Sequence, residues 1–126
     1  MWKIKLATVE SIIEAARNTY PEEFMSLLGG DKDAKTIDEL VVVPAVFGKT
    51  FTLVQSHLIP FDRKIVGSVH SHPSGYAHPS AGDLNSFSAF GVIHLIIGSP
   101  YTFDSIRAYN VGGRPVKVKA VREPSE

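Results

Sequence analysis

Two histidines and an aspartate within residues 70–83 have the side-chain types of a zinc site. His70 and His72 are one residue apart and follow the apolar run 65–69, so in a strand both imidazoles point to the same face. Asp83 lies eleven residues after His72. Two neutral imidazoles and one carboxylate leave a fourth tetrahedral position for water, which is typical of catalytic rather than structural zinc sites. The stretch therefore predicts one zinc ion per chain.

The segment 80–83 also has a structural interpretation. A serine followed three residues later by an acidic residue, just before an amphipathic run, indicates a helix N-terminus, here with Asp83 in place of the usual glutamate. The two interpretations are compatible, because the first turn of a helix fixes the direction of a ligand whose position must be accurate. The hydroxyl of Ser80 would stay near the site, where it could hydrogen-bond a substrate oxygen.

A hydrolytic zinc site also needs a base that takes a proton from water and later gives it to the leaving nitrogen. Glu22 and Glu23 open the apolar run 24–28 and are the candidates. Adjacent strand residues point to opposite faces, so one of the two can face the site. Alternation alone does not choose between them, and both could be solvated charges.

The other histidines have structural interpretations. His57 and His94 lie in apolar strands, where a single histidine is more often a hydrogen-bonded core residue than a metal ligand, and His78 lies in a polar loop. The chain has no cysteine, which excludes disulfides, thiolate nucleophiles and cysteine-ligated zinc. Thirteen basic and thirteen acidic residues leave no net charge, so neither nucleic acid nor membrane is expected as a partner.

Hydrophobic periodicity predicts an α+β fold with about eight short strands and two main helices. The first helix follows a short edge strand at 3–6, with Thr8 as its N-cap and Pro21 as its stop. The second begins at Ser80 and ends at Gly91. The other strands are expected at 24–28, 40–47, 50–55, 64–69, 92–97, 105–111 and 115–121, the last two as a closing hairpin.

The length of 126 residues predicts a single domain, 1–126, whose last residues, 122–126, form a frayed tail. The N-terminus lacks the apolar run of a signal peptide, and no apolar run approaches the roughly 20 residues of a membrane span. We therefore expect a cytoplasmic protein.

The spacing of these residues resembles the signature of the JAMM, or MPN+, metalloproteases. Their motif is a glutamate, then His-Ser/Thr-His, seven residues, Ser, two residues and Asp, and it is matched here by His70, Ser71, His72, Ser80 and Asp83. The family's glutamate stands in the pattern Glu-x-x-Gly-apolar-apolar-x-Gly. Residues 23–30 fit this pattern with Ser26 in place of the first glycine, which selects Glu23.

The resemblance covers nearly the whole chain and is to the short, stand-alone prokaryotic or archaeal type. It implies the MPN, or cytidine-deaminase-like, fold, a mixed curved β-sheet of about six to eight strands. It also implies a zinc-dependent isopeptidase acting after the C-terminal diglycine of ubiquitin-like small modifier proteins. His70, His72 and Asp83 would bind zinc, Glu23 would activate the zinc-bound water, and Ser80 would stabilise the oxyanion.

The implied partners are ubiquitin-like or sulfur-carrier proteins and their conjugates, and a homodimer is compatible with the sequence. The modifier's tail is expected as an added strand near 50–57 or at the loop 74–78. Three alternatives share parts of this pattern. A non-haem iron facial triad also uses two histidines and one carboxylate, but it gives Glu23 no role. The others are a non-catalytic scaffold of the same fold and a peptidase that releases an amino acid from a sulfur-carrier protein. A (β/α)₈ barrel needs about 200 residues or more and is excluded by length.

Overall fold

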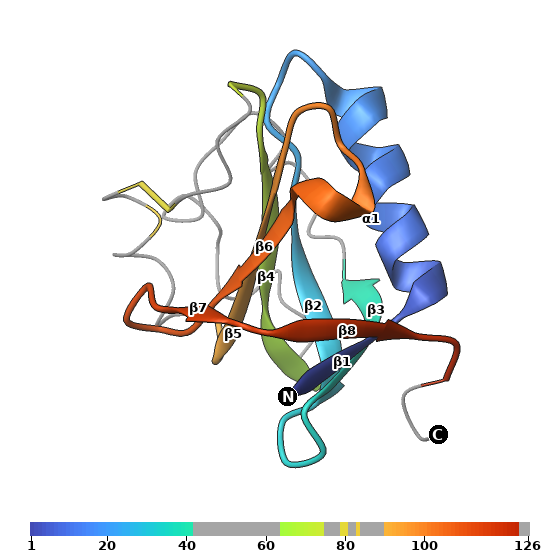
Figure 1. Ribbon diagram of the computed structural model, residues 1–126, viewed down its shortest axis with the longest axis vertical. Helices are drawn as coiled ribbons and strands as arrows, with labels where there is room; N and C mark the ends of the chain where they lie inside the picture. The colour runs from blue at the N-terminus through green and yellow to red at the C-terminus, as the bar shows by residue number, and fades with distance from the viewer. Residues whose placement is uncertain (42–63, 75–78, 81–82, 84–89, 124–126) are drawn as a thin grey trace.

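The computed structural model describes residues 1–41, 64–74, 79–80, 83 and 90–123. Figure 1 shows one helix lying along a strongly bent sheet. In chain order the elements are β1 (Trp2–Lys5), α1 (Leu6–Thr19), β2 (Met25–Asp31), β3 (Thr36–Val41), β4 (Ile65–His72), β5 (Ile93–Gly98), the 3-10 helix η3 (Phe103–Ser105), β6 (Ile106–Tyr109), β7 (Pro115–Val116) and β8 (Val118–Val121).

The sheet is mixed and nearly closed. The described residues contribute eight strands in the order β7-β6-β5-β4-β2-β3-β1-β8. The first and last of this order, β7 and β8, are consecutive in the chain and only Lys117 separates them. Strand β4 lies near the middle, antiparallel to β2 and parallel to β5. The predicted α+β class and the strand number are confirmed. No helix among the described residues is long and apolar enough to cross a membrane.

The prediction of two main helices is not confirmed, because α1 is the one α-helix in the described part of the chain. Most of the expected second helix, from Ser80 to Gly91, lies outside the described residues. The start of α1 also differs from the prediction, since Lys5 is the N-cap and makes no side-chain capping bond. Thr8 lies inside the helix and is buried, so it serves the core rather than the cap.

Strand β1 was expected at an edge, and this prediction is wrong. It pairs in parallel with β3 on one side and with β8 on the other. The closing hairpin is confirmed only for β6 and β7, where Ala108 pairs with Val116 and Tyr109 with Pro115. After Val116 the chain leaves β6, and β8 pairs with β1 instead. Residues 40 and 41 of the strand expected at 40–47 are the end of β3. The rest of that strand, the strand expected at 50–55 and the substrate edge near 50–57 lie outside the described residues.

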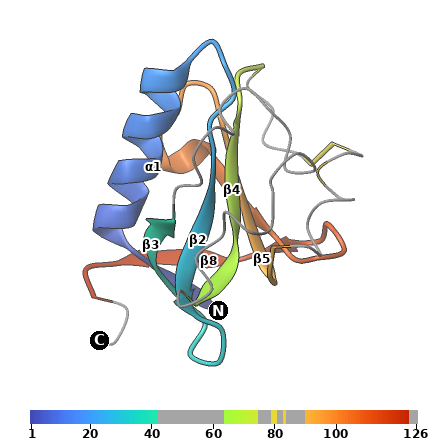
Figure 2. The same ribbon diagram turned by 180° about the vertical axis from the view of Figure 1, so that it is seen from behind.

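One face of the sheet packs against α1. Val9, Ile12 and Ala16 of α1 share an apolar cluster with residues of β4 and β5 that are fully buried, Val69, Leu95 and Ile97. Figure 2 shows α1 beside β2 and β3 from the opposite direction. Residues at i, i+3 and i+7 lie on one side of a helix, so the predicted apolar stripe of α1 is the surface that it buries.

Two glycines let the backbone at β4 and β5 approach closely. A side chain at Gly67 of β4 would overlap the carbonyl oxygen of Ile93, its partner in β5. Gly91, with φ +117°, lies just before β5, and a side chain there would overlap the carbonyl oxygen of Val66. That same oxygen accepts the Val92 N–H at 2.8 Å. These contacts fix β5 beside the strand that contains both histidines.

Candidate metal centre

The candidate centre is built on the end of β4. His70 and His72 are one residue apart in this strand, so both imidazoles lie on the face opposite to Val69 and Ser71. His70 is held between Met25 of β2 and Ile96 of β5, its partners in the sheet. His70 is almost fully buried and His72 is partly exposed, at 1% and 17% of their side-chain surfaces. The site therefore has one face in the core and one toward solvent.

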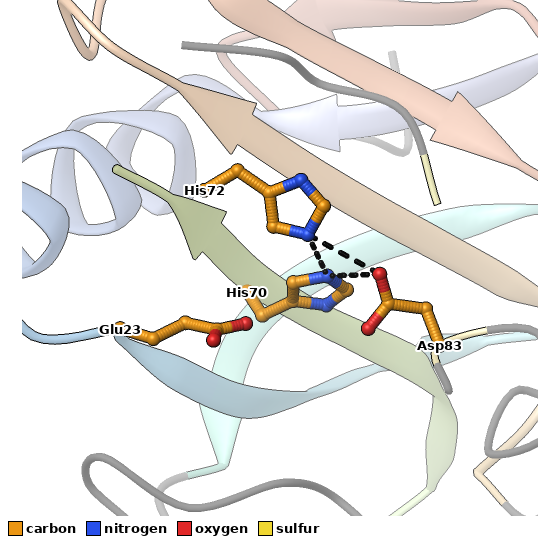
Figure 3. A group of neighbouring side chains, drawn as sticks. All are labelled: Glu23, His70, His72 and Asp83. Atoms are coloured by element: carbon orange, nitrogen blue, oxygen red, sulfur yellow. Dashed lines mark hydrogen bonds and ion pairs between the residues drawn. The ribbon is translucent and has the colours of Figure 1, made fainter. Parts of the chain in front are cut away.

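Three donor atoms converge on one point in front of these strands (Figure 3). His70 Nε2 and His72 Nε2 are 3.1 Å apart, and Asp83 Oδ2 lies 3.1 Å from the first and 3.2 Å from the second. Donors bound at about 2.0–2.2 Å to one tetrahedral zinc ion are about 3.3–3.5 Å apart. The observed triangle is therefore close to the size that a single zinc ion requires.

Asp83 is fixed by the reciprocal bonds that the sequence predicts for a helix N-terminus. The Asp83 N–H donates to Ser80 Oγ at 3.1 Å, and the Ser80 N–H donates to Asp83 Oδ2 at 2.8 Å. Burial alone would raise the pKa of Asp83, but the hydrogen bonds from His70, His72 and Ser80 lower it far below its usual range. The carboxylate is thus ionised and points its oxygen at the two imidazoles.

Glu23 is the fourth member of the group. Its carboxylate and the ligand atoms of His70, His72 and Asp83 all lie within 4.8 Å of one another, whereas Glu22 is exposed. Figure 3 shows the Glu23 side chain directed toward His70 from the segment before β2. Burial raises the pKa of Glu23, electrostatic interaction with His70 and His72 lowers it, and interaction with Asp83 raises it.

The polar pair next to the cluster has a structural role, as predicted for His94. Ser68 Oγ and His94 Nδ1 are 2.7 Å apart, and His94 Nε2 lies 3.2 Å from the Gly91 carbonyl oxygen. Burial lowers the pKa of His94 to about 4, and the positive charge of His70 acts in the same direction. His94 is therefore a neutral core histidine. His57 and His78 lie outside the described residues.

An apolar cavity of about 290 Å³ lies elsewhere, on the α1 face of the sheet. Its floor includes Ile4, Val9 and Leu95, and Asp104 and Arg107 are its charged residues. Arg107 donates to the backbone oxygens of Asp104 and Ile106, at 2.7 Å and 3.0 Å. Among the described residues, the group that could hold a metal ion is the one at the end of β4, and it is separate from this cavity.

Comparisons with known proteins agree with this geometry. A family model described as prokaryotic homologs of the JAB domain matches residues 5–111. A probable metalloprotease of Haloferax volcanii is 36% identical over 110 residues, which cover 80% of this chain and 68% of that protein.

Two solved structures are similar over almost their whole length. A JAB1/MPN domain protein from Archaeoglobus fulgidus has 39% identity and a TM-score of 0.76, covering 94% of this chain and 98% of that one. A structure described as a JAMM metalloprotease-like zinc site in the proteasome and signalosome has 35% identity and the same TM-score of 0.76. The second comparison covers 96% of this chain and 98% of the other.

Proposed function

The chain belongs to the family of prokaryotic homologs of the JAB domain, and on this basis we propose that it is a zinc-dependent isopeptidase. Its substrates would be conjugates of ubiquitin-like small modifier or sulfur-carrier proteins, cleaved after the C-terminal diglycine. The family and its metalloprotease character are shared with the similar proteins described above. We propose in addition which bond is cut and which class of modifier protein is recognised.

The convergence of Glu23 with His70, His72 and Asp83 carries the proposal. His70, His72 and Asp83 would hold the zinc ion, because their donor atoms already form a triangle of suitable size. When bound there, zinc would supply a Lewis acid that polarises the scissile carbonyl and lowers the pKa of water. Glu23 is near enough to take part without being needed as a ligand.

Glu23 would act as the general base and then as the general acid. Burial raises its pKa, so the carboxylate accepts a proton more readily than an exposed glutamate does. The water oxygen forms a bond to the carbonyl carbon while its proton passes to Glu23. The bond from that carbon to the lysine nitrogen then breaks, and Glu23 returns the proton to this nitrogen, so that an amine leaves.

Ser80 would stabilise the oxyanion that forms on the substrate. Its Oγ accepts the Asp83 N–H, which leaves its own O–H available to donate. The bonds between Ser80 and Asp83 hold this hydroxyl next to the ligand set. A hydrogen-bond donor fixed in advance near a developing negative charge is worth about 10²–10³ in rate.

The decisive experiment compares lysine-linked conjugates of ubiquitin-like proteins with linear fusions and sulfur-carrier adducts, with and without a chelator. We expect zinc-loaded protein to cut the lysine-linked conjugates and the chelator to stop it. Cleavage of only the adducts would replace the isopeptidase with a biosynthetic peptidase. If zinc-loaded protein cuts none of the three, the proposal fails.

Glu23→Ala tests the base in the same assay. We expect a loss of about 10²–10⁴ in rate, while one zinc ion per chain is retained in elemental analysis. Activity that survives this substitution would show that another group is the base. His72→Ala should lose both zinc and activity, and a variant that still holds zinc tightly would contradict the proposed ligand set.

A further inference from the structure

Ser71 lies between the two histidines of β4 but points to the other face of the sheet. It pairs with Ile97 of β5, which belongs to the apolar cluster beneath α1, and it is fully buried. A buried hydroxyl requires a hydrogen-bond partner, because leaving it unsatisfied in apolar surroundings is unfavourable. The Ser71 hydroxyl therefore needs a hydrogen-bond partner within the core.

That contact is the backbone of Phe24, the residue after Glu23. The Phe24 N–H donates to Ser71 Oγ at 2.8 Å, and the Ser71 N–H donates to the Phe24 carbonyl at 2.9 Å. In a regular antiparallel ladder the two residues would exchange both bonds through their backbones. Here the hydroxyl replaces the carbonyl oxygen of Ser71 as the acceptor. The β2–β4 ladder accordingly ends one pair earlier, at Met25 and His70.

The hydroxyl replaces the carbonyl acceptor next to Glu23, just before β2 begins. Glu23 lies two residues before β2, and its backbone is joined directly to the Phe24 N–H that Ser71 binds. The aromatic ring of Tyr101 contacts that of Tyr20 edge-on, with centroids 6.2 Å apart. Burial raises the pKa of Tyr101; the charges of Tyr20 and Glu23 raise it further, and the Ser71 hydroxyl lowers it. The bond between Ser71 and Phe24 thus lies one residue from Glu23, where the chain enters β2.

We propose that Ser71 is a positioning residue, whose hydroxyl fixes the backbone at Phe24 and thereby aims Glu23 at the histidine and aspartate cluster. The inference rests on the proposed function, because it gives Glu23 the role of base. The Ser71 side chain lies on the α1 face, opposite to the imidazoles of His70 and His72. Its hydroxyl would therefore act on the site through the backbone that carries Glu23.

The test uses Ser71→Ala and Ser71→Thr, with Ser26→Ala as the matched control. Ser26 is an equally buried serine of β2, and its hydroxyl donates to the Leu27 and Val41 carbonyl oxygens, 3.1 Å and 3.2 Å away, rather than accepting from the Phe24 N–H. We expect Ser71→Ala to lower kcat by about 10–100-fold, because a misplacement of about 1 Å can cost that much. The KM and the zinc content should stay as in the wild type.

Ser71→Thr keeps the hydroxyl, so its kcat should lie within about threefold of the wild-type value. The control Ser26→Ala should also stay within about threefold of the wild type. In a Glu23→Gln background, Ser71→Ala should cost no further rate, since residues that act as a unit are not additive. The proposal is overturned if Ser71→Ala leaves kcat unchanged, or if Ser26→Ala lowers kcat as much as Ser71→Ala does. It is also overturned if Ser71→Ala lowers kcat further in the Glu23→Gln background.

Hydrogen exchange of the Phe24 amide provides a measurement that needs no substrate. The amide should be protected in the wild type and in Ser71→Thr and Ser26→Ala, and should exchange at least about tenfold faster in Ser71→Ala. Equal protection in Ser71→Ala would refute the role of the hydroxyl even if rates changed. A wild-type protein that cuts no substrate would refute the proposed function alone, and the Phe24 amide would still decide this inference.

Discussion

The two faces of strand β4 differ in composition and in what they contribute. Toward α1 the strand presents Val69, which packs with Leu95 and Ile97 in the main apolar cluster. Toward the other side it presents Ser68, His70 and His72. Strand geometry alternates these side chains residue by residue, so one short element supplies both the core and the candidate site. The rigidity of the first face is what holds the second face in place.

The comparison also separates the kinds of damage that substitutions should cause. Changes on the α1 face should lower the free energy of unfolding and affect activity only through the folded fraction. Changes in the ligand set on the other face should remove zinc or activity and affect the metal-free fold much less.

Gly67→Ala should disrupt both faces, because its new side chain would overlap the Ile93 carbonyl oxygen and force β4 from β5. We expect a loss of at least about 4 kcal/mol in unfolding free energy, measured by chemical denaturation, together with loss of zinc. The control is Gly112→Ala, whose side chain would meet Asn110 Oδ1 at an ordinary 3.5 Å. Equal stability of the two variants would contradict the close approach of β4 and β5.

Leu95→Ala should damage the α1 face alone. The side chain is fully buried in the main cluster, so its removal should cost about 2–5 kcal/mol of unfolding free energy. The protein that remains folded should bind zinc with wild-type stoichiometry. Val111→Ala, at a side chain that is 38% exposed, provides the comparison and should cost far less. Loss of zinc from folded Leu95→Ala would show that the faces are not separable.

His70→Ala should damage the other face alone. Zinc at 100 times its dissociation constant should stabilise the wild type by about 2.7 kcal/mol, because the ion binds only the folded state. Denaturation curves with zinc and with a chelator measure this difference. The variant should show none of it. A variant that zinc stabilises as strongly as the wild type would remove His70 from the ligand set.

The Ser68–His94 pair lies on the same side of β4 as His70 and His72, but its role is to stabilise the fold. The pKa of His94 is lowered to about 4 when folded, below its ordinary 6.5, so the unfolded chain binds the extra proton more readily. Stability is therefore full above pH 6.5 and is lost as the pH falls toward 4. Metal-free wild type should lose about 2 kcal/mol from this group between pH 8 and pH 5.

His94→Asn supplies the reference for that prediction, since it removes the titrating group at a buried position. The variant's unfolding free energy should vary less with pH than that of the wild type over the same interval, whatever its absolute stability. Parallel pH profiles for the two proteins would show that His94 does not titrate as a buried core residue.

The sequence predicted the elements whose signals are local. The apolar run of β5 and the helical stripe of α1 are visible in short windows, and so is the bonding of Ser80 with Asp83. Long-range pairing is not visible in this way, which is why β1 was expected at an edge: its neighbours β3 and β8 come from distant parts of the chain. Thr8 has the chemistry of an N-cap, but burial against the sheet decides its place.

The site shows the same limit. The residue spacing predicted that His70, His72 and Asp83 form one site. The alternation of side chains along a strand did not distinguish Glu22 from Glu23. That choice depends on how the segment before β2 joins β4, through the bonds between Phe24 and Ser71. The motif resemblance selected Glu23, and the structure places its carboxylate beside the cluster. The motif includes Ser71, but nothing in the sequence indicates that its hydroxyl accepts the Phe24 N–H.

The parallel pairing of β1 with β8 has a consequence for how the protein is made. Trp2 lies opposite Val118 and Lys5 opposite Val121, so this ladder joins the beginning of the described chain to its end. Contacts of such sequence separation slow folding, because the entropy of loop closure is lost before the contacts form. On the ribosome, β1 must wait for its second neighbour until β8 has been synthesised. The side chains of the candidate metal centre emerge well before the sheet that supports them is complete.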